Sequence, residues 1–342
     1  MDKIWDYIFF TFDKGYWNYL WGEITNPNLH NYFYWLILVS LLFGSLEFMS
    51  PWRKQQKFFR KDFWLDAFYM FFNFFIFSLI IYNAASNVVV NFFNDAILSL
   101  VGINLAEINP LYQWPLWGVL VVGFFVRDFV QWWTHRLLHR FEFLWNFHKV
   151  HHSVEEMGFA AHLRYHWMET IVYRSIEYIP LALIGIGLYD FFIIHIFTLA
   201  IGHYNHSNIN IPDRIVGGVI FFLIGLVVVF GLFDFTAFDF GGNLVIQLAV
   251  LGLFTAVGYF ILSKYVKYIF NSPQMHIWHH AEYIPDGFKY GVNYGITLSM
   301  WDYIFGTAAI PTDGRDIKLG FEGVEQFPKK FLKQEAYGLL NK

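Results

Sequence analysis

The sequence predicts an all-α fold, a polytopic membrane helix bundle with a histidine-rich cap on its cytoplasmic side. Three observations lead to this prediction. The 342 residues are 56% hydrophobic and only 15% charged, whereas ordinary soluble domains are about 25% charged. Apolar stretches recur at the length that a bilayer crossing needs, roughly 20 residues. The 14 histidines gather in clusters near the ends of these stretches instead of being scattered over the chain.

Seven membrane spans are expected in the order of the chain. Five are uninterrupted apolar segments, at residues 32–49, 66–88, 114–132, 215–233 and 244–262. The apolar stretch 171–202 is broken by Pro180, Gly185 and Gly187, so we expect a hairpin of two short spans there. The first twenty residues mix charged and aromatic side chains and lack the apolar core of a signal peptide. They are expected to lie at the membrane interface.

The distribution of Lys and Arg predicts how these spans are oriented. Five basic residues cluster between positions 53 and 61, whereas the segments 91–113 and 234–243 contain none. Because basic loops stay in the cytoplasm, the basic segments and every main histidine cluster should share that side. A bacterial inner membrane is favoured over the endoplasmic reticulum, since the chain lacks cysteine, is rich in Phe, Asn and Ile, and shows no evident retention signal.

Three histidine clusters have the spacing that places side chains on one face of a helix. The clusters are His135 and His139, then His148, His151 and His152, and finally His276, His279 and His280. Imidazole is the commonest metal-ligating side chain at neutral pH. A structural zinc site closes with four ligands, so eight converging imidazoles are better explained by two metal ions. Without cysteine, any metal must be held by His, Asp, Glu or Asn.

The residues around these clusters strengthen the pattern. Arg127-Asp128 precedes the first cluster, Asn271-Ser272-Pro273 precedes the third, and WDYIFGT follows it at 301–307. Together, the HxxxH box and the two HxxHH boxes between membrane spans resemble the fatty acid hydroxylase/sterol desaturase superfamily. The resemblance covers about residues 125–310.

The resemblance implies a set of metal ligands. It includes the eight box histidines and, from segments similar to R-x-H-P-x-E and H-S-N-I, also His166 and His206. His203 and His162 match no usual position, and we expect them to be hydrogen-bonding neighbours of the ligands. His203, three residues before His206, is an alternative to His206 in the ligand set. The residues expected to orient the imidazoles are Asp128, Glu169 and Asn293. Glu155 and Glu156 are better explained as a solvated helix end.

The same resemblance implies an enzyme with two non-haem iron ions and O2 as co-substrate. We therefore expect an integral-membrane oxidoreductase that hydroxylates or desaturates a C–H bond of a membrane lipid. Its electrons would come from an external donor of the cytochrome, ferredoxin or pterin type, because the sequence shows no flavin or nicotinamide fingerprint. No catalytic residue is expected beyond the metal centre. With a net charge of −4, nothing indicates binding to nucleic acid.

Two alternatives stay open at this point. One is a pterin-dependent ether-lipid monooxygenase of the alkylglycerol type, and the other is a histidine-rich metal-binding or metal-transport membrane protein. The transport hypothesis would place ionisable side chains along a path at bilayer depth, whereas the boxes lie just beyond the ends of the spans. Imidazole suits iron, zinc and copper alike, so the sequence leaves the metal open.

The domain organisation follows from these assignments. Residues 1–112 would form the N-terminal spans and the interfacial helix, 113–310 a fatty acid hydroxylase-like catalytic domain, and 311–342 a cytoplasmic C-terminal tail. Most relatives run quickly from the H-S-N-I segment to the third box. Here an inserted pair of spans, at about 214–265, separates the two and returns the chain to the same side.

Overall fold

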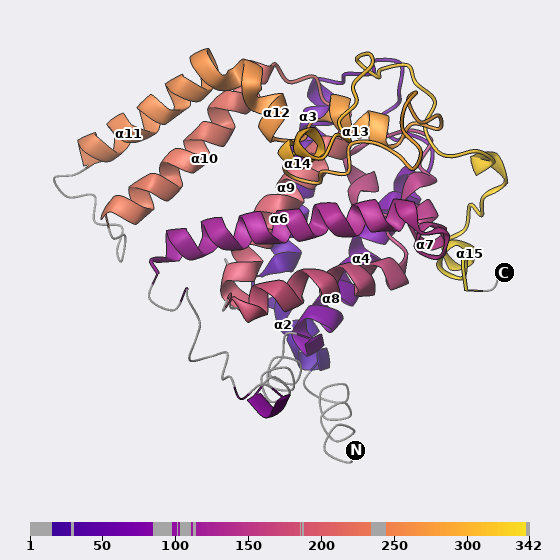
Figure 1. Ribbon diagram of the computed structural model, residues 1–342, viewed down its shortest axis with the longest axis horizontal. Helices are drawn as coiled ribbons and strands as arrows, with labels where there is room; N and C mark the ends of the chain where they lie inside the picture. Colours follow the sequence, from indigo (N-terminus) through magenta and orange to yellow (C-terminus); the bar gives the residue numbers. More distant parts are fainter. Residues whose placement is uncertain are drawn as a thin grey trace.

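The computed structural model describes residues 16–28, 31–84, 98–100, 102, 111, 114–184, 186, 188–233 and 244–339, and no β-strand occurs among them. The all-α prediction is confirmed (Figure 1). The longer helices are α2 (Tyr16–Thr25), α3 (Tyr32–Met49), α4 (Phe63–Ala84), α6 (Leu116–Arg140), α7 (Glu142–His152), α8 (Trp167–Leu183), α9 (Leu188–His206), α10 (Asp213–Phe233) and α11 (Leu244–Ala256). Short helical segments follow in the C-terminal part, with α12 (Val266–Ile269), α13 (Pro273–His279), α14 (Met300–Ile304) and α15 (Phe331–Glu335).

The helices follow the apolar segments of the sequence closely. Helix α3 has the bounds of its predicted span, and α10 begins two residues earlier than predicted. Helix α6 runs eight residues past the predicted end of its span, because the periodic pattern continues through His135 and His139. Pro180 lies inside α8 instead of ending it, so the break in the predicted hairpin falls later, between α8 and α9.

Within the described part of the chain, three helical segments are long and apolar enough to cross a membrane, at Tyr32–Met49, Leu116–Arg140 and Leu244–Ile269. They support a membrane protein. The count of seven spans and their orientation remain predictions. Residues 1–15 of the expected interfacial segment, residues 85–88 of the second predicted span, and the basic-residue-free segment 234–243 lie outside the described residues, as does most of 91–113.

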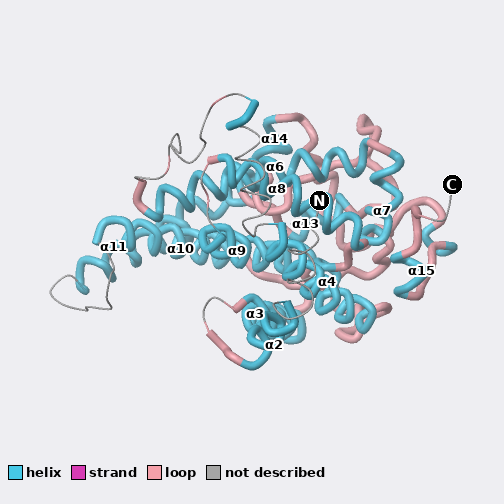
Figure 2. Tube along the Cα trace, turned by 90° about the horizontal axis from the view of Figure 1, so that it is seen from below, coloured by secondary structure: helices cyan, strands magenta, loops and turns pink. Residues whose placement is uncertain are grey.

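The body of the molecule is formed by α3, α4, α6, α8 and α9, which pack around a common apolar core. Core residues come from several of these helices, including Leu36 of α3, Phe74 of α4 and Leu199 of α9. The hairpin of α10 and α11 projects away from this body (Figures 1 and 2). Gly217 of α10 meets Gly258, in the π-helical turn Val257–Leu262 that continues α11, and a side chain at either position would collide with the opposite backbone. The predicted inserted spans therefore form a peripheral hairpin.

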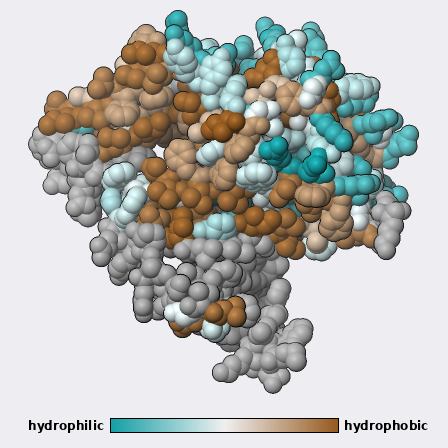
Figure 3. Space-filling view, viewed as in Figure 1, coloured by the Kyte–Doolittle hydropathy of each residue, from teal (hydrophilic) through white to brown (hydrophobic). Residues whose placement is uncertain are grey.

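The C-terminal segment forms part of a polar cap. Hydrophilic side chains gather on the side of the molecule that carries α7, α15 and the C-terminal loops, opposite the hydrophobic hairpin (Figure 3). Val324 and Gln334 are buried, and Glu335 accepts hydrogen bonds from the Tyr69 hydroxyl at 2.9 Å and from the backbone N–H of Trp167 at 3.0 Å. The residues expected to form a tail are thus packed against the helix bundle.

The basic cluster at positions 53–61 has a partly structural role. Arg60 is buried and forms an ion pair of 2.6 Å with Asp66, and Arg53 donates a hydrogen bond to the carbonyl of Met157. Lys54 and Lys57 are exposed. The cluster therefore combines a buried ion pair and a hydrogen bond to the backbone with a smaller exposed basic surface.

Candidate metal centre

Four helices bring the predicted ligands together. The end of α6 supplies His135 and His139, and α7 supplies the second box. Helix α9 ends at His206, whereas α13 carries His276 and His279 and is capped by His280. The side chain of Ser272 accepts a hydrogen bond from Met275 N and so fixes the start of α13. Residues up to 145 positions apart in the sequence thereby meet in one buried place.

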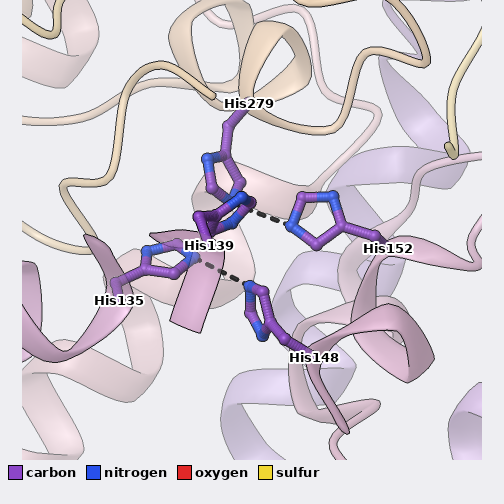
Figure 4. Close-up of side chains that lie close together, drawn as sticks. All are labelled: His135, His139, His148, His152 and His279. Carbon is purple, nitrogen blue, oxygen red and sulfur yellow. Dashed lines mark hydrogen bonds between the residues drawn. The ribbon is translucent and has the colours of Figure 1, made fainter. Parts of the chain in front are cut away.

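The histidines form two groups, each suited to one metal ion. The first group has five members, namely His135, His139, His148, His152 and His279, shown in Figure 4. The second group has four, namely His151, His206, His276 and His280. Within each group the candidate ligand nitrogens all lie within 4.8 Å of one another. We call the two groups together the histidine centre.

Backbone carbonyls fix how several of these imidazoles are protonated. The Nδ1 atoms of His135 and His279 lie 2.8 Å from the carbonyl oxygens of Tyr294 and Val292. In the second group, Nδ1 of His206 lies 2.8 Å from the carbonyl of Gly202. A carbonyl only accepts hydrogen bonds, so each Nδ1 must carry the proton. In the neutral ring, Nε2 is then left with a lone pair that points into the group.

Facing lone pairs in the second group are suited to a shared cation. The Nδ1 atom of His151 faces the carbonyl of Arg164 at 3.3 Å, so His151 and His206 both present unprotonated Nε2 atoms, which lie 3.2 Å apart. Two lone pairs cannot hydrogen-bond to each other. Two nitrogens bound at about 2.1 Å to one ion and at right angles would be about 3.0 Å apart. The observed separation therefore fits two ligands of a shared metal ion.

The same separation recurs around the centre. Nε2 of His276 lies 3.0 Å from Nε2 of His206 and 3.2 Å from that of His280. In the first group, His135 and His148 approach to 3.1 Å, as do His152 and His279. The buried Nε2 of His139 has no hydrogen-bond partner among the described residues. An ion in this group would supply the missing partner for His139.

Burial keeps the imidazoles neutral. It lowers the pKa of His148, His151 and His152 on α7 well below the usual value. The pKa values of His276, His279 and His280 are lowered in the same way. Neutral imidazole is the form that binds metals. The residues present thus fit two metal ions held by nitrogen ligands, a donor set that suits iron among other transition metals.

The remaining three candidate histidines lie outside both groups. His166 accepts a hydrogen bond at Nδ1 from Met168 N, and burial lowers its pKa to about 4. His162 and His203 face each other with their Nδ1 atoms 2.9 Å apart. The Nε2 atom of His203 lies 3.3 Å from the Ser40 hydroxyl. The structure therefore places His162 and His203 as hydrogen-bonding neighbours of the centre.

The predicted orienting residues have different surroundings. A carboxylate oxygen of Glu169 lies 2.9 Å from Nδ1 of His148, which is the contact that orients an imidazole. Asp128 instead accepts hydrogen bonds from Leu298 N and from the Trp301 indole. Asn293, in a left-handed conformation with φ 56°, donates to the carbonyls of Met275 and Ala309. Asp128 and Asn293 therefore hold the loop around the third box.

The acidic pair after α7 serves another purpose. Glu155 binds the ammonium groups of Lys61 and Lys329 at 2.9 and 2.7 Å. Glu156 accepts a hydrogen bond from Lys61 N at 2.8 Å. These contacts tie the α3–α4 connection and the C-terminal segment to the end of α7, at the solvated rim of the cap.

Sequence reasoning passed over Asp302. This buried carboxylate accepts hydrogen bonds from the Trp132 indole, Tyr294 N and Gly295 N, at 3.0, 2.9 and 2.7 Å. It thereby fixes the carbonyl of Tyr294 that orients His135. Asp302 could have been identified from the sequence, because it stands in the WDYIFGT segment. The backbone carbonyls that accept hydrogen bonds from the imidazoles cannot be identified from a sequence.

Comparisons with known proteins found sequences similar to this chain. The profile of the fatty acid hydroxylase family matches residues 120–225 and 213–307, which together are more than half of the chain. An ornithine lipid hydroxylase, OlsE of Rhizobium tropici, is 27% identical over 224 residues. The match covers 66% of this chain and 51% of that protein, so the chain spans about half the length of this curated relative. No solved structure matches the chain.

Proposed function

Because the chain belongs to the fatty acid hydroxylase family, we propose that it is a membrane-embedded, O2-dependent di-iron enzyme that hydroxylates a lipid. The observation that carries the proposal is the pair of imidazole groups, one of five and one of four histidines. Their unprotonated nitrogens face one another at about the separation of ligands on one ion. Hydroxylation is preferred to desaturation because the curated relative is named a hydroxylase.

Bound iron would supply the chemistry that lets O2 attack an unactivated C–H bond. The side chains of the chain would hold the ions and keep them in place. The carbonyls of Tyr294, Val292 and Gly202 fix three imidazoles by their Nδ1 atoms, and Glu169 fixes a fourth, His148. Burial of the whole centre excludes bulk water, which protects a reactive site from side reactions.

The substrate is proposed to be a membrane lipid that enters from the bilayer. Apolar side chains cover much of α10, α11 and the N-terminal half of α6, and no water-filled approach is needed for such a substrate. An ornithine lipid is a specific candidate because the relative is named for it. An ether lipid with a tetrahydropterin donor is the alternative to be tested beside it.

The electrons are proposed to come from an external donor on the cytoplasmic side of a bacterial inner membrane. The exposed Lys54 and Lys57 lie in the connection that contacts the loop after α7, through Lys61 and Glu155. Such a basic surface attracts an acidic partner. A cytochrome or a ferredoxin would supply the two electrons that the reaction requires in two one-electron transfers, and a tetrahydropterin would supply both.

The first experiment measures metal in protein purified from iron-supplemented cells. We expect about two iron ions per chain and, with a reducing system, O2-dependent addition of one oxygen atom to a lipid of the membrane extract. His151→Ala and His279→Ala should each lower the iron content and abolish product formation. The protein should still insert in the membrane, because neither residue lies in one of the three described segments that are long and apolar enough to cross it.

His166→Ala is the matched control. His166 is also buried, but it lies outside both groups, so this variant should keep two irons per chain. Iron content that is unchanged in His151→Ala would contradict the di-iron proposal. Zinc instead of iron, or transport of metal into vesicles without any lipid product, would favour a metal-binding or transport protein.

A further inference from the structure

A buried polar network lies beside the histidine centre, inside the apolar part of the helix bundle. Arg127, Gln131 and His135 follow one another at intervals of four residues on α6, so they share one face of that helix. With a rise of 1.5 Å per residue, Gln131 lies about 6 Å and Arg127 about 12 Å along the helix from His135. Polar side chains at such depth are costly and generally serve a function.

Helices α8 and α9 complete this network. Glu177 of α8 lies 3.4 Å from the Arg127 guanidinium, which also donates a hydrogen bond to Thr198 of α9. The side-chain amide of Gln131 donates from Nε2 to Glu177. A carboxylate accepts hydrogen bonds, so this contact fixes which end of the Gln131 amide is oxygen.

The oxygen of Gln131 is left without a partner. Gln131 is only 6% exposed, and its Oε1 is buried without a hydrogen-bond partner among the described residues. A buried acceptor that makes no hydrogen bond destabilises the folded protein. A ligand group that donates a hydrogen bond to Oε1 would recover this free energy.

The network borders a cavity that adjoins the histidine centre. Arg127, Gln131 and Glu177 line a hollow of about 50 Å³. A second hollow is lined by His135, His148, His151, His206 and His276. The two hollows share Tyr165, Tyr173 and Ile296 as walls. The hollow beside the polar network therefore adjoins the one beside the histidines.

We propose that this cavity binds a hydrogen-bond donor of the lipid substrate, a hydroxyl or an amide N–H, through Oε1 of Gln131. The proposal rests on the hydroxylase function and specifies its substrate class. The donor would lie about 6–12 Å from the histidine centre along α6, so it belongs to the substrate but stands apart from the oxidised carbon. A plain acyl chain has no group to place there.

The charges of the cavity exclude a free anionic headgroup. Its charged lining residues are Arg127 and Glu177, which form an ion pair with each other. No positive charge is left in excess to compensate a phosphate or a free carboxylate in this buried place. The substrate group recognised here is therefore uncharged.

The test compares lipids that differ only in the donor. One pair is N-dodecylhexadecanamide and dodecyl hexadecanoate, which replace an amide N–H by an ester oxygen. The other pair is methyl 12-hydroxyoctadecanoate and methyl octadecanoate. Equal amounts of both members are offered to the purified iron-loaded protein without O2, and the retained lipid is extracted and quantified by mass spectrometry. We expect a preference of about tenfold for the donor in at least one pair.

Gln131→Leu should reduce this preference to less than about twofold, because it removes the acceptor while keeping an apolar volume. Gln247→Leu is the matched control. Gln247 is a buried glutamine on the peripheral helix α11, and its replacement should leave the preference intact. Preference for the amide alone or for the hydroxyl alone identifies the donor.

Equal retention within both pairs by the wild-type protein would overturn the proposal, and so would a preference that survives Gln131→Leu. If Gln131→Leu fails to fold, the wild-type ratios still decide. Lipid retention is measured without O2 and without turnover, so it is a separate readout from iron content and from product formation. The inference and the proposed function can therefore fail separately.

Discussion

Helix α6 and the α10–α11 hairpin are both apolar enough to enter a membrane, but they differ in what they bury. In an apolar stretch of 18 residues within α6, 33% of the residues are buried in the protein, whereas 11% are buried in the corresponding stretch of Leu244–Ile269. The inward face of α6 carries Arg127, Gln131 and His135. The polar residue that α11 buries is Gln247. Hydropathy therefore identifies both regions as membrane segments, and only the buried polar side chains distinguish the region that carries function.

The largest expected contrast is in metal content. His276→Ala leaves three imidazoles in the second group, so we expect the loss of about one metal ion per chain. Turnover should fall by more than about 100-fold. Loss of a residue that only orients a metal ligand costs about 10- to 100-fold, and loss of the ligand itself should cost more. Gln247→Ala in the hairpin should leave the metal content unchanged. Elemental analysis of the purified variants measures both.

His139→Ala refines this contrast within the centre itself. Its group keeps four imidazoles after the substitution, which suffice to complete a tetrahedral site. This variant should therefore retain more metal than His276→Ala. Equal loss of metal from His139→Ala and His276→Ala would contradict the division into one site with five ligands and one with four.

A smaller effect is expected at the carboxylate that supports the centre. Burial raises the pKa of Glu169 well above its usual value, and a cation bound to His148 would favour the ionised form. Glu169→Gln keeps the shape but removes the negative charge facing His148, so metal affinity should fall by about 10- to 100-fold. Metal retention during titration with a chelator measures this loss.

Glu155→Gln is the control for that substitution. The Glu155 carboxylate is partly exposed and binds lysines at the rim, so its replacement should leave metal affinity unchanged. If Glu155→Gln lowered the affinity as much as Glu169→Gln, the contact with His148 would not be the cause.

Much of this arrangement could be predicted from the sequence, and the reasons for success and failure are physical. Apolar runs determine helices directly, so the bounds of α3 were predicted to the residue. The i, i+3 and i+4 spacing placed the box histidines on common helix faces. The spacing within a box says nothing of how boxes interleave, and His151 and His152 in fact belong to different groups.

What escaped prediction depends on contacts between distant segments. The C-terminal residues are polar enough to read as a tail, but Glu335 binds Tyr69 and the start of α8. The network around Arg127 was also missed, since Gln131, Glu177 and Thr198 lie on three different helices. A lone polar residue in an apolar helix carries no spacing pattern, and only the folded structure shows what it faces.

The smallest expected effect compares one substitution in the two regions. Leu138 of α6 is 1% exposed and packed inside the protein, whereas Leu253 of α11 is 62% exposed. Leu138→Ala should destabilise the protein by about 2–5 kcal/mol, because it leaves a cavity in a packed interior. Leu253→Ala should cost less than about 0.5 kcal/mol, since a lipid chain can fill the space and lipid tails are as apolar as leucine. Denaturation of both variants in the same lipid nanodiscs measures the difference. A large loss of stability in Leu253→Ala would mean that the outer face of α11 packs against protein, and the hairpin would then be an interface instead of a lipid-facing surface.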